Sequence, residues 1–368
     1  MILPILPFYI VSLGGAGVAV GLIGGLSDSV ASILKVISGF WSDRIGKRKP
    51  FVFWGYFSSA LAKLFFPFAR SWPVLLVLRP IERIGKGLRD APRDALIASS
   101  TSADIRGKVF GFHRAADTLG AVFGAGLAFL LYGFLKLEFR PILLISALLA
   151  FLALLPLFFV SEKKNPPPPS TKYSSFSSFR DSLTELPEDF KHYLTIATIF
   201  AFANFTYMFF ILRAKNFFIQ VFTPRLSIII PVLLYVWYNI FYSLFSLPAG
   251  VLSDRIGRKK MLISGYLVYA LTCLGFIVSN SLGLFILFFA LYGTSYALVE
   301  GNQRAYASDF VSEEKRGLAL GAFHTVVSLA ALPSGIVVGL LWNYDPSLPF
   351  LYGSILSLVA VISFLFLK

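Results

Sequence analysis

The chain has 368 residues, of which 57% are apolar and only 14% are charged, and its mean hydropathy is +0.75. This composition excludes a soluble globular protein and is typical of a chain that lies almost entirely in a lipid bilayer. The net charge of +14 would suggest nucleic-acid binding in a soluble protein, but here Lys and Arg gather in alternate loops between apolar segments. We therefore expect lipid as a partner and no nucleic acid.

Apolar segments follow one another along the whole chain and predict twelve membrane-spanning helices. The first six lie at about residues 2–13, 17–40, 51–69, 72–96, 108–134 and 141–160. The second six lie at about residues 192–212, 228–250, 261–279, 282–304, 317–341 and 349–367. Residues 2–13 are too few to cross a hydrocarbon core of about 30 Å. The first helix is therefore expected to be shortened at its N-terminal end.

Positive charge marks one side of the predicted membrane domain. The loops after the second, fourth and eighth spans are rich in Lys and Arg, whereas residues 14–16, 279–281 and 343–349 contain neither. Because basic loops are retained in the cytoplasm, both termini are predicted to be cytoplasmic, in the inner or plasma membrane.

A polar segment divides the chain into two parts. Residues 161–191 include Pro166 to Pro169 and a Ser-rich stretch, which is the composition of a linker. This predicts an N-terminal six-helix bundle at residues 1–160, a cytoplasmic linker at 161–191, and a C-terminal six-helix bundle at 192–368.

Two sequence repeats relate the two parts. Residues 39–49 are GFWSDRIGKRK and residues 250–260 are GVLSDRIGRKK, an offset of 211 residues. Residues 102–111 are SADIRGKVFG and residues 312–321 are SEEKRGLALG, an offset of 210. Repeats of this kind predict two parallel bundles with a substrate site between them near the bilayer midplane.

The segment at residues 39–49 resembles the loop 2-3 signature of the major facilitator superfamily, and the segment at 250–260 resembles it again. The resemblance implies an all-α membrane protein with two pseudo-symmetric six-helix bundles that rock around a central site. It also implies that these loops latch the bundles together in one state. The alternative is that their charges only fix the orientation of the helices in the membrane. The predicted gating residues are Gly39, Asp43, Arg44, Gly46, Arg48, Gly250, Asp254, Arg255, Gly257 and Arg258.

Charged residues lie inside the second and fourth spans. Asp28 is near the middle of the second span, and the fourth span contains Arg79, Glu82 and Arg83. An ionised group at this depth costs about 2.5–3.5 kcal/mol, so these side chains are expected to face a polar chamber or one another. Asp28 and Glu82, together with Asp117 of the fifth span, are predicted to bind and release protons, tuned by Arg79, Arg83 and Arg114. The alternative for Asp28 is a structural ion pair with Lys35 or with the fourth span. The string GKGLRDAPRDALIA, residues 85–98, resembles a prokaryotic subgroup of the superfamily that has no assigned substrate.

The fifth span combines titratable and small residues on one face. His113 and Asp117, one helical turn apart, continue into Gly120 and Gly124. This predicts a proton site, with Arg114, beside a packing seam. The glycine spacing resembles the fifth-helix motif of antiporters in the superfamily, with Ala125 in place of its Pro. For His113 a simple packing role is the alternative.

The second half has no acid at mid-depth in its first three spans, and Asn239 stands at the position that matches Asp28. Polar and aromatic residues there predict hydrogen bonds and ring surface for a substrate, or else ordinary packing. These candidates are Asn204, Tyr207, Tyr235, Asn239 and His324.

Together these patterns predict a monomeric secondary active transporter that binds a small molecule and protons. Proton-coupled efflux by antiport is the favoured hypothesis, with uptake by symport as the alternative and a non-transporting receptor or scaffold as the rival from another class. The sequence contains no HExxH, GxSxG, GxxxxGK[ST] or paired Cys/His motif, so neither an enzyme nor an ATP-driven pump is expected. Three His and the single Cys273 predict no metal centre, and no cofactor is expected.

Overall fold

The structure, a computed structural model, describes residues 1–101, 106–160, 162, 186–311 and 316–367, and all regular secondary structure in these ranges is helical. Ten helical segments within them are long and apolar enough to cross a membrane. Each of the twelve predicted spans corresponds to one or two helices, so the chain is a multi-pass membrane protein. The helix at 72–99 falls outside the ten only because it is so rich in charge.

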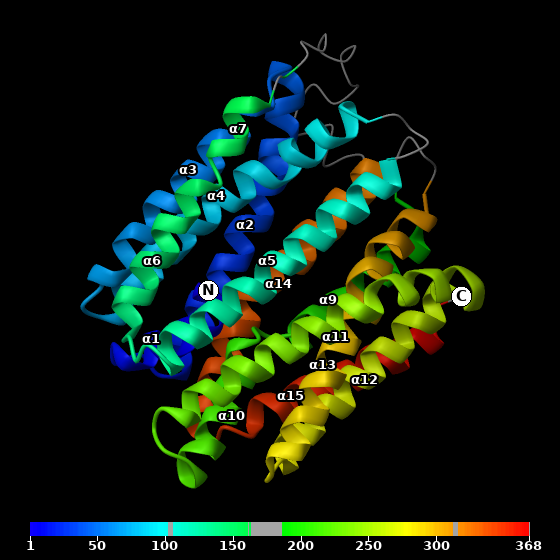
Figure 1. The fold of residues 1–368 in the computed structure, drawn as a ribbon. Coiled ribbons are helices and arrows are strands. Elements are labelled where there is room, and N and C mark those ends of the chain that lie inside the picture. Colours follow the sequence, from blue (N-terminus) through cyan, green and yellow to red (C-terminus); the bar gives the residue numbers. More distant parts are fainter. Residues whose placement is uncertain (102–105, 161, 163–185, 312–315, 368) are drawn as a thin grey trace.

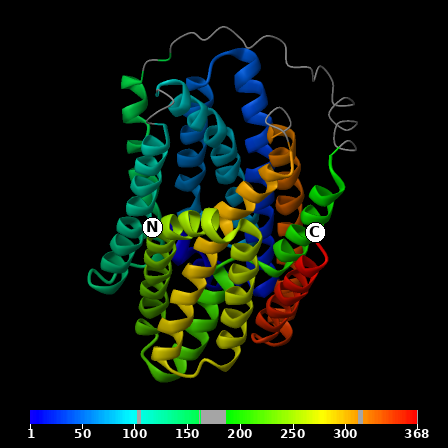
Figure 2. The same ribbon diagram turned by 90° about the vertical axis from the view of Figure 1, so that its right-hand side faces the viewer.

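The helices that precede residues 163–185 form the first half of the molecule, and those that follow form the second half (Figures 1 and 2). The first half comprises α1 (Ile2–Ser12), α2 (Gly17–Ile45), α3 (Lys49–Phe65) with the 3-10 turn η1 (Phe66–Phe68), α4 (Trp72–Ser99), α5 (Arg106–Gly133), α6 (Phe139–Leu152) and α7 (Leu155–Phe159). The second half comprises α9 (Glu188–Ala203), α10 (Met208–Val221), α11 (Leu226–Ile256), α12 (Arg258–Val278), α13 (Leu282–Asp309), α14 (Arg316–Tyr344) and α15 (Leu348–Leu365).

The seventh span differs from its prediction. It was expected at residues 192–212, but helix extends from 188 to 221 with an interruption at 204–207 between α9 and α10. The break leaves carbonyl groups without helical partners, which is costly in a membrane. The hydroxyl groups of Ser334 and Tyr269 donate to the carbonyl oxygens of Phe202 and Ala203, at 2.8 and 2.9 Å, and so replace the missing backbone bonds.

The two halves have similar features at the ends of α2 and α11. Gly46 and Gly257 follow these helices with positive φ angles of 69° and 95°. The guanidinium of Arg48 donates to the carbonyl oxygen of Ala95 at 3.2 Å, and that of Arg258 donates to Ala305 at 3.1 Å. At the offset of 211 residues Arg258 corresponds to Lys47, so the two halves make similar contacts here from neighbouring positions of the repeat.

The halves touch each other at the end of the molecule that is distant from the repeated loops. Near the start of α2, Gly21 packs so closely against Gly335 of α14 that a Cβ on either glycine would meet the backbone of the other. Between α5 and α11, a Cβ on Gly133 would lie 3.3 Å from Ile229, and Arg225 donates to the carbonyl oxygen of Lys136 at 3.1 Å. Small residues therefore seal this end of the space between the halves.

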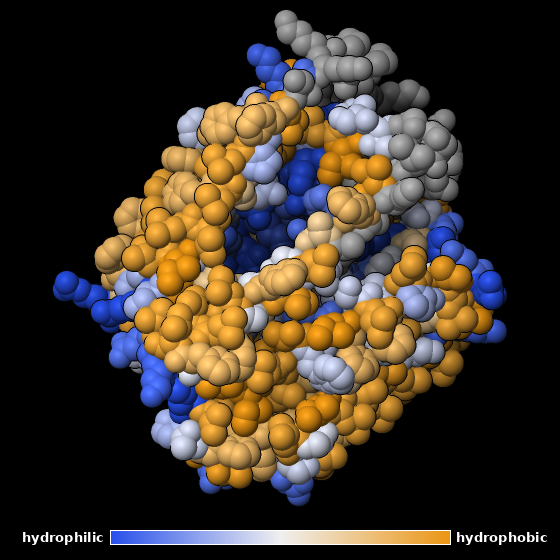
Figure 3. All heavy atoms as spheres, in the orientation of Figure 1, coloured by the Kyte–Doolittle hydropathy of each residue, from blue (hydrophilic) through white to orange (hydrophobic). Residues whose placement is uncertain are grey.

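Between α4 and α5 the surface is hollowed, and the hollow is lined by hydrophilic residues (Figure 3). The surface around it in this view is predominantly apolar. Large apolar side chains, among them Phe123, Phe158 and Leu247, are exposed on the molecule. An apolar exterior around a polar interior is the arrangement expected of a transport protein in lipid. We call the polar space between α4 and α5, the second of which packs against α11 of the second half, the central chamber.

Candidate transport site

Helix α4 places three charged side chains on the central chamber. Arg79, Glu82 and Arg83 are three and four residues apart, so they share one helical face. Arg79 is only 2% exposed and Glu82 only 4%. Buried charges of this kind require partners, because an isolated ion in a low-dielectric interior is strongly unfavourable.

Glu82 lies at the centre of a cluster of cations. Its Oε2 atom is 2.5 Å from Nη1 of Arg79 and 3.9 Å from Nε of Arg83, and its Oε1 atom is 3.5 Å from Nζ of Lys63. Lys63 reaches it because α3 approaches α4 at a glycine contact, where a Cβ on Gly85 would meet the carbonyl oxygen of Gly55. We call Lys63, Arg79, Glu82 and Arg83, together with Asp28, the ion cluster.

Asp28 of α2 completes the ion cluster on its more accessible side. Its Oδ1 atom is 3.8 Å from Nη2 of Arg83, and its side chain is 57% exposed. Among the residues that the structure describes, Asp28 and Lys35 form no ion pair, so of the two structural pairings expected for Asp28 only the one with α4, through Arg83, is made. The cluster thus joins α2, α3 and α4 around one chamber wall.

The candidates on α5 lie apart from the ion cluster. Asp117 is exposed and His113 is partly buried, and no ion pair connects either to α2 or α4 within the described part of the chain. The side chain of Arg114 is outside the described residues. A Cβ on Gly120 would meet nothing within 4 Å, whereas one on Gly124 would lie 2.8 Å from the amino nitrogen of Met1. The expected glycine seam is therefore unpacked at Gly120.

Tyrosines of the second half face the ion cluster across the chamber. The rings of Tyr207 and Tyr235 are 5.2 Å apart, and the Tyr207 hydroxyl donates to the carbonyl oxygen of Leu3 at 3.2 Å. That hydroxyl lies within electrostatic reach of Arg79 and Arg83. The structure therefore brings Tyr207 and Tyr235 together with the first-half cations.

The other second-half candidates have more local contacts. Asn204 accepts a hydrogen bond from Tyr296 at 3.0 Å, close to the break between α9 and α10. Asn239 donates to the carbonyl oxygen of Tyr235 in its own helix at 2.7 Å. His324 packs beside the ring of Phe323, with centroids 5.3 Å apart.

Two elements of the chamber were missed by the sequence analysis. Lys63 could have been found, because it is an isolated cation within the apolar segment at 51–69. The hydrogen bond from Tyr242 of α11 to Glu300 of α13 could not, because nothing in the sequence fixes which faces of these helices meet.

Among the predicted gating residues, Asp254 and Arg258 form ion pairs within their own half. Asp254 is 3.5 Å from Arg258, which also pairs with Asp309. A Cβ on Gly39 would lie 3.3 Å from Cβ of Ala91, while Arg44 and Arg255 are exposed. The side chain of Asp43 is outside the described residues.

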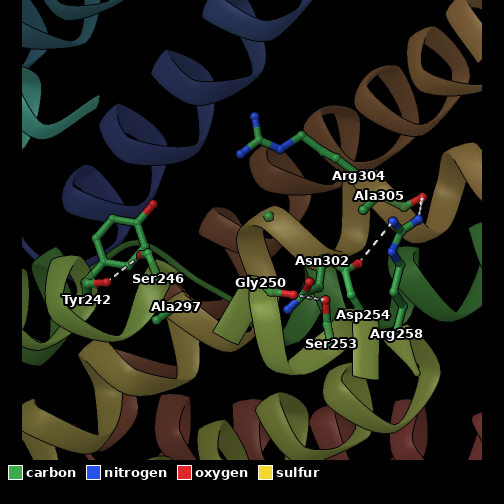
Figure 4. A pocket seen from close by; sticks show the side chains of 11 residues that line it. Tyr242, Ser246, Gly250, Ser253, Asp254, Arg258, Ala297, Asn302, Arg304 and Ala305 are labelled. Carbon is green, nitrogen blue, oxygen red and sulfur yellow. Dashed lines mark hydrogen bonds and ion pairs between the residues drawn. The ribbon is translucent and has the colours of Figure 1, made fainter. Parts of the chain in front are cut away.

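Beside the second-half loop, α11 and α13 enclose a pocket of about 350 Å³ (Figure 4). Gly250, Asp254 and Arg258 line it from one side and Asn302, Arg304 and Ala305 from the other. Within the described residues, no cluster of three or more His, Cys, Asp or Glu side chains could hold a metal ion.

Comparison with known proteins agrees with this architecture. The sequence model of the family described as Major Facilitator Superfamily matches residues 1–232 and 225–368. An uncharacterized MFS-type transporter of Methanocaldococcus jannaschii is 46% identical over 367 residues, covering 100% of this chain and 90% of its own length. Multidrug resistance protein 2 of Bacillus subtilis is 29% identical over 119 residues, covering 32% of this chain and 30% of its own length. The crystal structure of the nucleoside transporter NupG matches with a TM-score of 0.82 at 16% identity, covering 99% of this chain and 94% of that one.

Proposed function

Since this chain belongs to the Major Facilitator Superfamily, we propose that it is a secondary active transporter that moves a small organic solute by alternating access. One observation carries the proposal: the structure combines a hydrophilic hollow between α4 and α5, a buried ion cluster on α4, and small residues that join the halves at the end distant from the repeated loops, so the end near those loops is proposed to be the open one. The seal at Gly21 and Gly335 is a close backbone contact without ion pairs. Contacts of this kind separate and reform as rigid bodies rock, which is the motion that alternating access requires.

The open end is proposed to face the cytoplasm. The loops there carry Arg44, Lys47, Arg255 and Lys260, and basic loops are retained on the cytoplasmic side. The protein would then lie in the inner or plasma membrane with both termini cytoplasmic, and the conformation described here would be open to the inside. The two bundles would be residues 1–160 and 192–368, joined by the linker at 161–191. A single chain encloses the chamber, so we propose that it works as a monomer.

Coupling to protons is assigned to the acids of the first half. Three cations surround the Glu82 carboxylate within 4 Å, an arrangement that suits a structural counter-ion. Asp28 is exposed to the chamber and has one cation at 3.8 Å, so it is better placed to exchange a proton with water. Asp117, exposed on α5, is the second exchange site, with His113 and Arg114 nearby in sequence.

The direction of transport is proposed to be efflux by antiport. The relative from Bacillus subtilis, named as a multidrug resistance protein, and the partial antiporter motif of α5 support it. Proton-coupled uptake is the second candidate, and the contact of Asp28 with Arg83 favours it. Protonation of Asp28 would release Arg83 to bind a solute, so that proton and solute would enter the chamber together.

The test is solute flux in proteoliposomes with an imposed pH gradient, read by an internal pH dye over a panel of small organic solutes. We expect at least one solute to move against its gradient, with the sign of proton movement distinguishing antiport from symport. Asp28→Asn and Asp117→Asn should each weaken the response, whereas Glu188→Gln on the exposed end of α9 should not. A response that is absent for every solute, or unaltered in both Asn variants, would contradict proton coupling.

A further inference from the structure

The central chamber has two walls of different chemistry. The wall from α3 and α4 carries Lys63, Arg79, Arg83 and Lys86, whereas its acids are Glu82 and, from α2, Asp28. Cations therefore outnumber acids on this side. Among the residues that the structure describes, Lys86 forms no ion pair within 4.0 Å, although the charges of Arg83, Asp90, Asp28 and Arg89 all influence it.

Two guanidinium groups of this wall have donors that are not used. Arg79 is 2% exposed, and only its Nη1 atom is bonded, to Glu82; its Nε and Nη2 atoms are buried without hydrogen-bond partners. The Nε atom of Arg83 is also buried and lacks one. Unmet donors on a buried cation are unfavourable, and a ligand with a pair of acceptor oxygens relieves this cost.

The facing wall, from the second half, is a row of tyrosine rings. The row begins at Tyr207, which the charges of Arg79 and Arg83 influence, and continues through Tyr235 and Tyr238 to Tyr296 with ring centroids 5.2, 5.7 and 5.7 Å apart. The acid nearest to this row, Glu300, accepts a hydrogen bond from Tyr242 and is 3.7 Å from Arg304. Tyr235 and Tyr238 are each 7% exposed and Tyr207 and Tyr296 are partly exposed, so ring surface is accessible mainly at the two ends of this row, and Glu300 beside it is already bonded.

We propose that the transported solute is an organic anion that carries a flat aromatic ring. Its carboxylate would be bound by Arg79 and Arg83, and its ring would pack on Tyr207 and Tyr235. The assignment rests on the proposed transport function and specifies its substrate class. A bidentate carboxylate matches the fork of a guanidinium, and ring stacking matches the tyrosine wall, so the two ends of such a solute fit the two halves of the chamber.

The binding test uses purified protein and three aromatic carboxylates, namely benzoate, phenylacetate and indole-3-acetate, each compared with its neutral amide and with an amine of matched size. A ligand that binds the folded state raises its melting temperature. We expect at least one carboxylate to raise it and its amide and amine counterparts to do so less. Stabilisation by the amines alone, or by no carboxylate, would overturn the proposal.

Variants locate the binding site. Arg83→Gln should weaken carboxylate binding about tenfold or more, because a charge-assisted hydrogen bond is lost. Arg304→Gln, at an exposed arginine of the second half, is the matched control and should bind as the wild type does. Arg79→Gln alone leaves Glu82 short of a partner and risks unfolding, so the double variant Arg79→Gln/Glu82→Gln tests Arg79. Unchanged affinity in both Arg83→Gln and the double variant would overturn the assignment.

Flux measurements with the same compounds keep the substrate class separate from the transport function. If amines drive solute-dependent proton flux in proteoliposomes and carboxylates do not, the transport proposal holds and the anion proposal fails. If carboxylates bind at Arg83 but no compound crosses the membrane, the anion site holds and transport fails.

Discussion

Helices α4 and α13 occupy equivalent positions in the two halves, but their inward faces differ completely in chemistry. At an offset of 210 residues, Glu82 of α4 corresponds to Tyr292 of α13, and Lys86 corresponds to Tyr296. The first half buries an ion cluster where the second half buries aromatic rings. The repeated fold therefore fixes the path of the backbone but not the character of the interior.

The packing of the two halves follows from this difference. In the first half, α3 and α4 meet at Gly55 and Gly85, and small residues let charged side chains reach one another. In the second half, rings fill the space: Phe210 stacks on Tyr292 at 4.0 Å, and Phe200 stacks on Tyr266 at 3.7 Å. The accessible acid Asp28 of the first half can respond to protons, whereas the buried ring pairs Phe210–Tyr292 and Phe200–Tyr266 carry no charge that could respond. The comparison suggests a responsive first half that works against a rigid second half.

The largest effect is expected from breaking the ion cluster. Glu82→Gln leaves Arg79 and Lys63 without their buried counter-ion and should lower the free energy of unfolding by about 3–5 kcal/mol. Denaturant titration of the purified protein measures it. Glu300→Gln on α13, an acid whose side chain is 42% exposed, is the control and should cost no more than about 1 kcal/mol. Equal losses in the two variants would remove the distinction between the halves.

The next largest effect is expected at the contact between α2 and α14, which joins the halves. Gly21→Ala places a Cβ against the carbonyl oxygen of Gly335 and should destabilise the sealed end by about 1–3 kcal/mol. Labelling of a cysteine introduced at Val18 should become faster as this end opens. Gly120→Ala, where a Cβ meets nothing within 4 Å, should leave the labelling rate unchanged. Slower labelling in Gly21→Ala than in the wild type would contradict the described seal.

A smaller effect tests whether the stability of the second half depends on its aromatic rings or on its polar groups. Tyr266→Phe keeps the ring that stacks on Phe200 and removes only the oxygen that accepts from Gln303 at 2.8 Å. The loss should be about 1 kcal/mol, the value of one ordinary hydrogen bond. Unfolding midpoints measured in parallel with Glu82→Gln provide the comparison, and a loss as large as that of Glu82→Gln would show that polar contacts dominate this half as well.

The smallest effect is expected at an accessible ion pair of the second half. Arg304 and Glu300 are 3.7 Å apart with side chains 45% and 42% exposed, so solvent screens their attraction. Arg304→Gln should change stability by no more than about 0.5 kcal/mol, and high salt should abolish the difference. A loss comparable to that of Glu82→Gln would mean that burial does not decide the strength of these pairs.

The sequence predicted much of this architecture, because hydropathy and the duplicated loops report directly on membrane spans and on their repetition. It also indicated that Asp28, Arg79, Glu82 and Arg83 turn away from lipid, and the structure gathers these four side chains. It did not predict the break at 204–207, because hydroxyl groups from distant helices compensate it. Nor did it reveal the unpacked Gly120, since the packing of α5 depends on how far the two halves are apart.

Alternating access itself is tested most directly by distances between spin labels across the two ends of the chamber. Double electron–electron resonance on a background in which the buried Cys273 is replaced by Ala would use one label pair at Lys47 and Arg255 and another at Lys136 and Thr223, all four exposed. The account predicts that a transported solute or a change of pH shifts the two distance distributions in opposite directions, one shortening as the other lengthens. Two distributions that stay fixed, or that lengthen together, would contradict it.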